Sequence, residues 1–194
     1  MGVILGAIPD RVGIIGEAYI DFGGESCVAW IERYDNLLVI QTFSKSRSLA
    51  GARLGFGIGC EALIRDLNTV KYSINPYNVN RMTQAAGVAA IEDDAYYREK
   101  AQTIMRVREE TTEQLCALGF TVLPSTANFV FAKSDRLRGE ELYQSLKSRG
   151  VLVRHFTKER IKDFCRITIG TREQMQVLVK NIEEILAQKG SVSQ

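Results

Sequence analysis

Short apolar runs bounded by turn residues occupy the first third of the chain. They lie at residues 12–15 (VGII), 37–43 (LLVIQTF) and 53–59 (RLGFGIG), the last with glycine at alternate positions. Apolar runs of this length predict strands covered on both faces, which is typical of a parallel or mixed α/β sheet. Three strands do not complete such a sheet, so we expect only part of an α/β domain here.

From residue 81 to about residue 118 the apolar spacing becomes helical. Asp93 and Asp94 predict a break and restart, because aspartate caps helix N-termini well, and Gly119 stands where a glycine would end the second helix. Each helix is predicted to bury one face. These faces consist of Met82, Ala85, Ala86 and Ala89, and of Ile104, Val107, Thr111, Leu115 and Leu118.

The remainder of the chain alternates between predicted strands and helices. A last helix opens at Thr171 with Gln174 at the spacing of a capping box. We therefore predict one domain at 1–94, an α+β domain at 95–190 and a disordered tail at 191–194. The strands of the second domain are predicted at 120–124, 128–132, 151–156 and 164–170, with a helix at 139–150.

Charge and hydropathy exclude several classes of function. The 194 residues carry a formal net charge of only +2, which disfavours nucleic acid as a partner because phosphate backbones attract strongly basic surfaces. No window approaches the roughly 18 consecutive apolar residues of a membrane span, and the opening residues lack the basic region of a signal peptide. We therefore expect a soluble, cytoplasmic protein that contacts no membrane.

The cysteine and histidine content limits metal and nucleophile chemistry. The four cysteines form no CxxC pair, so no zinc site or thioredoxin motif is indicated, and we expect buried free thiols. The single histidine, His155, makes a Ser/His/Asp triad hard to build, and we interpret it as a structural or surface residue. No metal is predicted.

The stretch 41–59 (QTFSKSRSLAGARLGFGIG) runs from a predicted strand into a lysine flanked by hydroxyls and small residues. One interpretation is a surface turn with a solvated Lys45. The other is a phosphate cradle, in which Thr42 and Ser44 offer hydroxyl donors and Arg53 offers a planar fork for bidentate binding. Beside a bound carbonyl cofactor, Lys45 would then form a Schiff base, a standard use of lysine in covalent catalysis.

The same stretch carries a family resemblance. TFSKSRSLAGARLGF resembles the Schiff-base segment of fold-type I pyridoxal-phosphate enzymes. Together with EAYIDF upstream and PYNVN and FCRITIGTREQ downstream, it makes the chain from residue 7 to residue 188 similar to the histidinol-phosphate aminotransferases. The resemblance implies an aspartate aminotransferase-like fold, with the C-terminal part of the cofactor-binding large domain at 1–94 and the small domain at 95–190. It also implies pyridoxal 5'-phosphate as cofactor and a homodimer.

The resemblance assigns roles to individual residues. Lys45 matches the lysine that holds the cofactor and later moves the proton between the substrate Cα and the cofactor. Thr42, Ser44 and Arg53 match the positions that bind the cofactor phosphate. Tyr19 matches the tyrosine that bonds the phenolic oxygen, whereas without the resemblance the favoured interpretation of Tyr19 is a strand aromatic packed in the core.

Two arginines near the C-terminus match substrate-binding positions of the family. Arg166 in CRITIG matches the arginine that binds the acidic group of the substrate, and Arg154 in VLVRHF resembles a second anion contact. Without the resemblance, both would read as charges at the edges of strands.

The chain departs from the family pattern in one residue of the cofactor site. The family reads Asp-Glu-Ala-Tyr where this chain reads Gly16-Glu17-Ala18-Tyr19. That aspartate pairs with the pyridinium nitrogen and makes the ring an electron sink. Loss of a charge-assisted bond costs about 1.5–3 kcal/mol. On a strand the side chain of Glu17 would point to the opposite face, so we expect no substitution by it.

The resemblance covers only the C-terminal half of the family enzymes. We therefore expect the glycine-rich phosphate loop and the aromatic that stacks on the pyridine to be missing, and the strand edges and apolar surface left behind to favour self-association. The sequence thus leaves three functions open. The first is an aminotransferase for histidinol phosphate and glutamate or 2-oxoglutarate that has weak or no activity in this chain. The second is a related aminotransferase for aromatic or other phospho-amino substrates, and the third is a non-catalytic module that binds the cofactor or a partner.

Overall fold

The computed structural model describes residues 2–7 and 9–192, and the chain divides into two compact units, Met1–Lys100 and Ala101–Gln194. The predicted boundary between residues 94 and 95 falls at the start of helix α4 (Asp94–Ala117), in which the first unit ends and the second begins. Within the described ranges, no helix combines the length and the apolar character that a membrane span requires.

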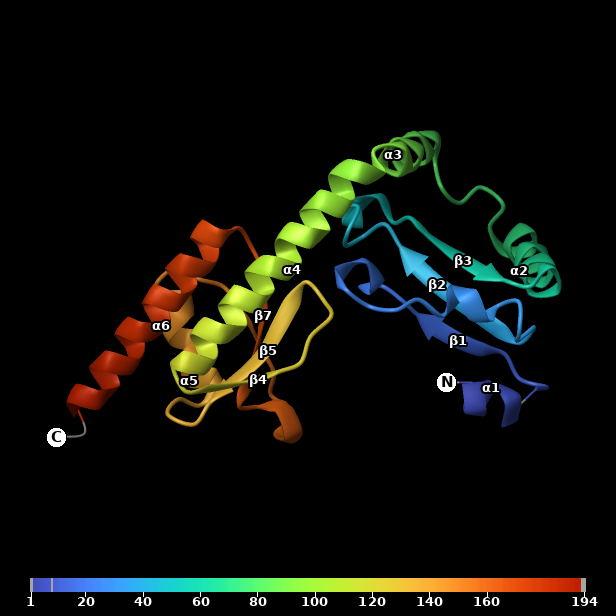
Figure 1. Ribbon diagram of the computed structural model, residues 1–194. Helices are drawn as coiled ribbons and strands as arrows, with labels where there is room; N and C mark the ends of the chain where they lie inside the picture. The colour runs from blue at the N-terminus through green and yellow to red at the C-terminus, as the bar shows by residue number, and fades with distance from the viewer. Residues whose placement is uncertain (1, 8, 193–194) are drawn as a thin grey trace. The chain divides into compact units, whose positions relative to one another are not determined.

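The first unit is built on a mixed three-stranded sheet, as the apolar runs predict (Figure 1). Its strands are β1 (Gly13–Gly16), β2 (Leu37–Thr42) and β3 (Gly55–Gly59). β1 runs parallel to β2, and β3 runs antiparallel to it. Because parallel neighbours end at the same edge, the segments that follow β1 and β2 are close in space.

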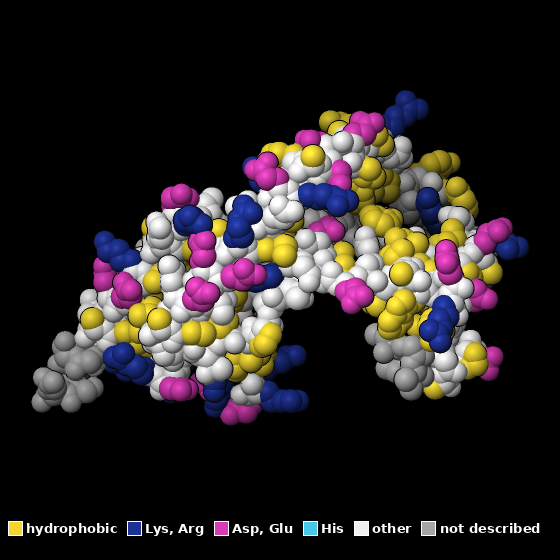
Figure 2. Space-filling view, viewed as in Figure 1, with side chains coloured by type: hydrophobic (Ala, Val, Ile, Leu, Met, Phe, Trp, Pro, Cys, Tyr) yellow, Lys and Arg dark blue, Asp and Glu magenta, His cyan; other side chains and the backbone are white. Residues whose placement is uncertain are grey.

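Only one face of this sheet is fully covered. It packs on a core of Leu5, Leu37 and Val39. On the opposite face Ile14 and Ile40 stay 63% and 42% exposed, so the prediction of strands covered on both faces is wrong for these residues. Figure 2 shows hydrophobic side chains at the surface of the first unit. Alternating strand residues point to opposite faces, so Ile14 and Ile40 share a face with the buried Leu38, and this second face is only partly covered.

Three helices complete the first unit. α1 (Gly2–Ala7) and α2 (Glu61–Ile74) have no counterpart among the predicted elements, and α3 (Arg81–Glu92) is confirmed. The buried face predicted for α3 is wrong: Thr83, Gly87 and Ala90 are buried, whereas Met82 is 84% exposed. A Cβ at Gly87 would lie 2.5 Å from the Cδ2 atom of Leu54, so the smallest residues, not the largest apolar ones, form the contact.

The second unit packs helices against a four-stranded antiparallel sheet of order β4-β5-β7-β6. The predicted face of α4 is confirmed, since Val107, Thr111 and Leu115 are buried and Ile104 and Leu118 pack against the same core. The elements are β4 (Phe120–Leu123), β5 (Phe129–Ser134), α5 (Gly139–Ser148), β6 (Arg154–His155), β7 (Phe164–Thr168) and α6 (Arg172–Val192).

Several local predictions in the second unit can be checked. Gly119 has the left-handed φ of +82° that favours glycine after a helix. The capping box is confirmed, because the Thr171 N–H donates to Gln174 Oε1 at 2.9 Å and the Gln174 N–H to Thr171 Oγ1 at 3.3 Å. The prediction of a disordered tail at 191–194 is not confirmed for its first half, because α6 includes residues 191 and 192. Residues 193 and 194 lie outside the described residues.

The cysteines are free thiols, but the prediction that they are buried holds for one of them. Cys165 is buried, Cys27 and Cys60 are half-buried and Cys116 is exposed. Burial raises the pKa of the Cys165 thiol to about 11. This thiol packs as a small apolar group.

Candidate functional site

The segment that carries Lys45 connects β2 to β3 and is closed by its own backbone. The Phe43 N–H donates to the Leu54 carbonyl at 3.1 Å, and the Leu49 N–H donates to the Phe43 carbonyl at 3.0 Å. The Ser48 N–H also donates to the Lys45 carbonyl, at 3.1 Å. These bonds make residues 43–54 an ordered loop, so the main chain of Lys45 has a defined position.

The side chain of Lys45 lies beside Tyr19. Its Nζ is 5.4 Å from the centroid of the Tyr19 ring, within the range of a cation–π contact. Lys45 is half-buried, and among the described residues its ammonium has no hydrogen bond or ion pair. An amine that is partly withdrawn from water and unpaired is available for a covalent bond. The interpretation of Lys45 as a fully solvated turn residue is therefore disfavoured.

The two hydroxyls before Lys45 lie together. Thr42 Oγ1 is 2.8 Å from Ser44 Oγ, and the Ser44 N–H donates to Thr42 Oγ1 at 3.1 Å. Thr42 Oγ1 also donates to the Leu54 carbonyl at 3.2 Å. Hydroxyls and backbone N–H groups gathered at a strand end are donors suited to an anion.

Arg53 is less closely tied to this group. It is exposed, has a φ of +55°, and its guanidinium donates to the Ala50 carbonyl at 3.0 Å. It lines a hollow of about 800 Å³ formed by β3, α2 and the start of α3. Among the described residues, no hydrogen bond joins it to Thr42, Ser44 or Lys45. The four predicted phosphate and lysine positions therefore lie at the end of β2 and in the loop that follows it, but among the described residues Arg53 makes no hydrogen bond to the other three.

Gly16 is the last residue of β1, and a Cβ placed there would meet no atom within 4 Å. The space that a carboxylate would need is therefore open. The neighbouring Glu17 does not fill it, because its carboxylate accepts hydrogen bonds from Ser26 Oγ at 2.7 Å, the Cys27 N–H at 2.6 Å and Gln41 Nε2 at 2.9 Å.

The ionisation of Glu17 reflects these bonds. Burial by itself would raise the pKa of its carboxyl, but the hydrogen bonds from Cys27, Ser26 and Gln41 outweigh burial and hold the pKa below its usual value. Glu17 is thus a charged structural residue that anchors the segment after β1. This agrees with the expectation that it does not replace the missing aspartate.

In the second unit, the sheet register sets the two candidate substrate arginines opposite each other. Arg154 on β6 pairs with Arg166 on β7, and Arg166 pairs on its other side with Phe131 on β5. The Nε atom of Arg166 is buried and has no hydrogen-bond partner among the residues that the structure describes. Its guanidinium carbon lies 5.2 Å from the ring centroid of Phe129. Since buried polar atoms are almost always bonded, this orphan donor indicates a site for an acceptor.

Aromatic rings surround these arginines, which the sequence reasoning missed. Phe131 stacks on Phe164 with centroids 4.6 Å apart and meets Phe156 edge-on at 5.8 Å. The guanidinium carbon of the exposed Arg154 lies 5.6 Å from the Phe156 centroid. The period-2 alternation of apolar residues in 128–132 was the available signal, since it places phenylalanines on the face opposite the core.

His155 packs against a neighbouring helix and a loop. His155 Nε2 lies 2.7 Å from the Lys162 carbonyl, and its ring stacks on Tyr143 with centroids 6.0 Å apart. These are the contacts of a residue that packs and holds a loop. Within the part of the chain that the structure describes, no cluster of three or more His, Cys, Asp or Glu side chains could hold a metal ion.

In the first unit, the segments after the parallel strands β1 and β2 bring together a lysine, a tyrosine and two hydroxyls, an arrangement that suits an enzyme with a phosphorylated carbonyl cofactor. Comparison with known proteins identifies the family. The sequence profile described as "Aminotransferase class I and II" matches residues 12–182. The chain therefore belongs to the aminotransferase class I and II family, whose enzymes use pyridoxal phosphate.

Among curated proteins, the chain is similar to histidinol-phosphate aminotransferases. The chain is 50% identical over 184 residues to the histidinol-phosphate aminotransferase of Clostridium beijerinckii, which covers 95% of this chain and 51% of that protein. It is 52% identical over 176 residues to that of Syntrophus aciditrophicus, covering 91% and 49%. The chain is thus a homologue of histidinol-phosphate aminotransferases and spans about half the length of the curated relatives it matches.

Solved structures agree on the fold. The histidinol-phosphate aminotransferase of Clostridium acetobutylicum superposes with a TM-score of 0.87 at 26% identity, over 96% of this chain and 58% of that chain. The L-threonine-O-3-phosphate decarboxylase of Porphyromonas gingivalis reaches 0.77 at 22% identity, over 95% and 58%. Because an aminotransferase and a decarboxylase share the fold, the fold by itself does not define the reaction.

Proposed function

We propose that the chain supplies the lysine-bearing part of a pyridoxal-phosphate-dependent aminotransferase that acts on histidinol phosphate with glutamate or 2-oxoglutarate as the second substrate. The unpaired, half-buried amine of Lys45 beside Tyr19 carries the proposal. The identity of about half of all aligned residues to histidinol-phosphate aminotransferases supports the choice of substrate. In this proposal residues 1–94 belong to the cofactor-binding domain and residues 95–190 to the small domain.

The residues around Lys45 have the chemistry to hold the aldehyde, the phenolic oxygen and the phosphate of the cofactor. Lys45 would bind its aldehyde, Tyr19 would donate to its phenolic oxygen, and Thr42, Ser44 and Arg53 would bind its phosphate. The gathered hydroxyls of Thr42 and Ser44 support the phosphate assignment. When bound, pyridoxal phosphate supplies an electron sink that stabilises negative charge at the substrate Cα.

The protein residues would act on the substrate in two ways. Lys45, once its amine is released, would take the proton from the substrate Cα and deliver it to the cofactor. Arg166 and Arg154 would bind the phosphate or carboxylate of the substrate, which the orphan Nε of Arg166 supports. The phenylalanines beside them would exclude water and give a flat apolar surface for the organic part of the substrate.

Gly16 favours a second candidate function. Without a carboxylate at that position the pyridine nitrogen is not held in its protonated form, so the negative charge that develops in the reaction is less stabilised. The chain would then be a cofactor-binding module with weak or no transamination. A sibling activity on aromatic or other phospho-amino substrates, and a homodimer, also stay open within the proposal.

A titration with pyridoxal phosphate tests the proposal. We expect a new visible absorbance band in the wild-type chain and its absence in the Lys45→Ala variant. Addition of glutamate or histidinol phosphate, tested separately, then shows by loss of that band whether the amino group is transferred. A band that Lys45→Ala leaves unchanged, or no band at all, would refute the proposal.

The Gly16→Asp variant separates the two candidate functions. Because a Cβ at this position meets nothing within 4 Å, the substitution should fit without repacking. A restored charge-assisted bond should tighten cofactor binding by about 1.5–3 kcal/mol. Transamination that appears only in Gly16→Asp would identify the wild-type chain as a binding module. The isosteric Gly16→Asn variant is the matched control, since it adds the same volume without the charge.

A further inference from the structure

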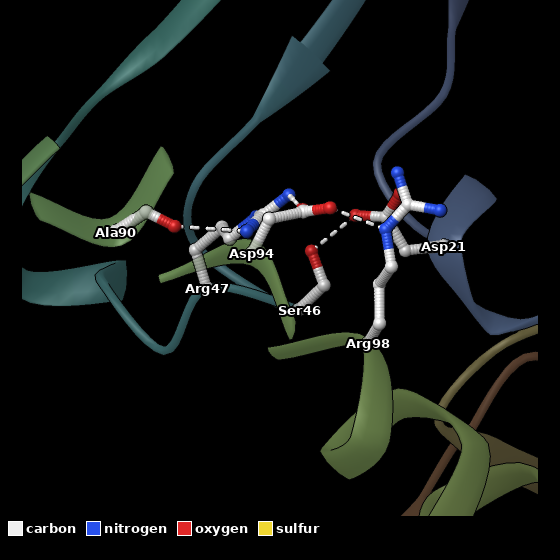
Figure 3. Close-up of polar contacts among 6 residues, drawn as sticks. All are labelled: Asp21, Ser46, Arg47, Ala90, Asp94 and Arg98. Atoms are coloured by element: carbon white, nitrogen blue, oxygen red, sulfur yellow. Dashed lines mark hydrogen bonds and ion pairs between the residues drawn. The ribbon is translucent and has the colours of Figure 1, made fainter. Parts of the chain in front are cut away.

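Arg47, two residues after Lys45, extends to the junction between helices α3 and α4 (Figure 3). Its Nη1 donates to the Ala90 carbonyl at 2.8 Å, and its Nη2 donates to Asp94 Oδ1 at 2.5 Å. Its guanidinium carbon lies 5.3 Å from the ring centroid of Tyr97. The side chain is only 21% exposed, so these contacts are shielded from water far more than those of an ordinary surface arginine.

The partners of Arg47 are groups that favour a cation. Ala90 lies in the last turn of α3, where carbonyls lack partners inside the helix. Asp94 is the first residue of α4, and it also binds Arg98, whose side chain is 76% exposed. The hydrogen bonds from Arg47 and then Arg98 hold the pKa of Asp94 below its usual value, so the carboxylate is charged near neutral pH.

The same face of α3 holds the far end of the lysine loop. Thr83 Oγ1 donates to the Ala52 carbonyl at 3.4 Å, and the backbone at Gly87 approaches the Leu54 side chain closely. Thr83, Gly87 and Ala90 are the buried residues of the helix. The loop is therefore attached to one stripe of α3 at three successive turns, and Arg47 makes the attachment nearest to Lys45.

A second anchor lies at Ser46, the residue between Lys45 and Arg47. The hydroxyl of Ser46 donates to Asp21, which follows Tyr19 by two residues (Figure 3). The next residue but one, Ser48, has a φ of +56°, a left-handed conformation that is uncommon for serine. Such a conformation persists only where the surroundings fix it, and the bonds from residues 46 and 47 do so.

We infer that Arg47 is a positioning residue for Lys45: together with Asp94 it fixes the loop against α3, so that the amine is presented in one place beside Tyr19. The cofactor part of this inference rests on the proposed function. The loop part does not, because it concerns the ligand-free chain. The competing role is a purely structural one, in which Arg47 only joins α3 to α4.

Two measurements on the full chain separate these roles. Hydrogen exchange of the ligand-free chain reports the order of residues 43–54 and, independently, of the helix junction at 88–98. The yield and rate of borohydride-trapped pyridoxal phosphate on Lys45 report how well the amine is presented. A small misplacement of a reacting group can lower a rate by about 10- to 100-fold. We expect a loss in that range for Arg47→Ala, with faster exchange across 43–54.

Matched variants complete the test. Asp94→Asn removes the ionic partner and should shift both measurements in the same direction. Arg47→Lys keeps the charge but not the fork that binds two acceptors, so it should recover part of the loss. Arg98→Ala removes the other arginine on Asp94, which among the described residues makes no hydrogen bond or ion pair with the loop, and it should change both measurements less than twofold.

The outcomes decide the inference either way. If Arg47→Ala disturbs exchange only at 88–98, or if Arg98→Ala has an equal effect on 43–54, Arg47 is structural and the inference fails. If wild-type chain traps no cofactor, the proposed function fails, while exchange across 43–54 and acetic anhydride labelling of Lys45 still test the positioning of the loop. If Arg47→Ala does not fold, Asp94→Asn serves with the same expected direction.

Discussion

The two units of the chain differ in how completely each buries its apolar residues. In the second unit one face of the sheet and the helices on it enclose a continuous core, with Val130, Leu146 and Ile182 fully buried. In the first unit the core around Leu37 and Val39 is small, and α2 buries none of its residues. A unit stabilised by a continuous core should hold its structure by itself, whereas one with a partly uncovered sheet face should be the weaker part.

The two candidate sites differ in the same way as the two units. The candidate lysine site lies in the unit with less burial, where the loop depends on specific polar contacts such as those of Glu17 and Arg47. The candidate anion site lies on the second unit, whose core fixes the strand that carries Arg166. The following experiments test this contrast.

Removal of core volume from the second unit should have the largest effect. Leu146 is fully buried, so Leu146→Ala should lower the free energy of unfolding by about 2–5 kcal/mol, from lost transfer energy and the cavity left behind. Val177→Ala on α6, where the side chain is 53% exposed, should change it by less than about 0.5 kcal/mol. Urea titration followed by circular dichroism measures both. Equal effects would contradict the packing described here.

Native-state hydrogen exchange compares the two units directly. Amides of β5 and β7 should exchange at least about a hundredfold more slowly than those of β1 and β2, which corresponds to about 2.8 kcal/mol at 1.4 kcal/mol per factor of ten. The reason is that the second sheet rests on a continuous core. Equal protection in both sheets would mean that the first unit gains stability from a source other than its own core.

The buried carboxylate of Glu17 should give a pH-dependent contribution. Because its folded pKa lies below the unfolded value, its stabilisation is complete above the usual carboxyl pKa of about 4.3 and is lost as pH falls through the folded pKa. Glu17→Gln should therefore destabilise the first unit by about 1–3 kcal/mol at pH 7. The difference from wild type should shrink under acid conditions. A constant difference across this range would refute the role of the charge.

The exposed sheet face should affect association more than stability. Ile14 is 63% exposed, so Ile14→Thr should change the free energy of unfolding by less than about 0.5 kcal/mol. It should nevertheless reduce self-association, because exposed apolar patches drive contacts between molecules. Sedimentation velocity at several concentrations measures this, with Val177→Thr as the control. Unchanged association would show that this face does not contribute to it.

Much of the fold could be predicted because its signals are local. The apolar runs gave β1 to β3, and the helical spacing gave α3 and α4 with a break near residue 93. Helix α2 was missed although Leu63, Leu67, Val70 and Ile74 form an apolar stripe at helical spacing, and none of these residues is buried in the structure. The wrong face was expected for α3 because its contact surface uses Thr83, Gly87 and Ala90, and close packing by small residues leaves no hydrophobic stripe.

The candidate site was predictable only in part. The pairing of Tyr19 with Lys45 followed from motif resemblance, and parallel pairing of β1 and β2 brings the two segments together. The bond between Arg47 and Asp94 joins residues 47 positions apart and has no local pattern. The orphan Nε of Arg166 likewise depends on strand register, which the sequence did not specify.

The central claim is that Lys45 is the covalent anchor for pyridoxal phosphate. Borohydride reduction of the chain mixed with one equivalent of the cofactor, followed by peptide mass mapping, tests it most directly. We expect one label per chain, on the peptide that contains Lys45, and none on that peptide in Lys45→Ala. Label spread evenly over the exposed lysines, with Lys45 no more reactive than Lys71 or Lys147, would contradict it.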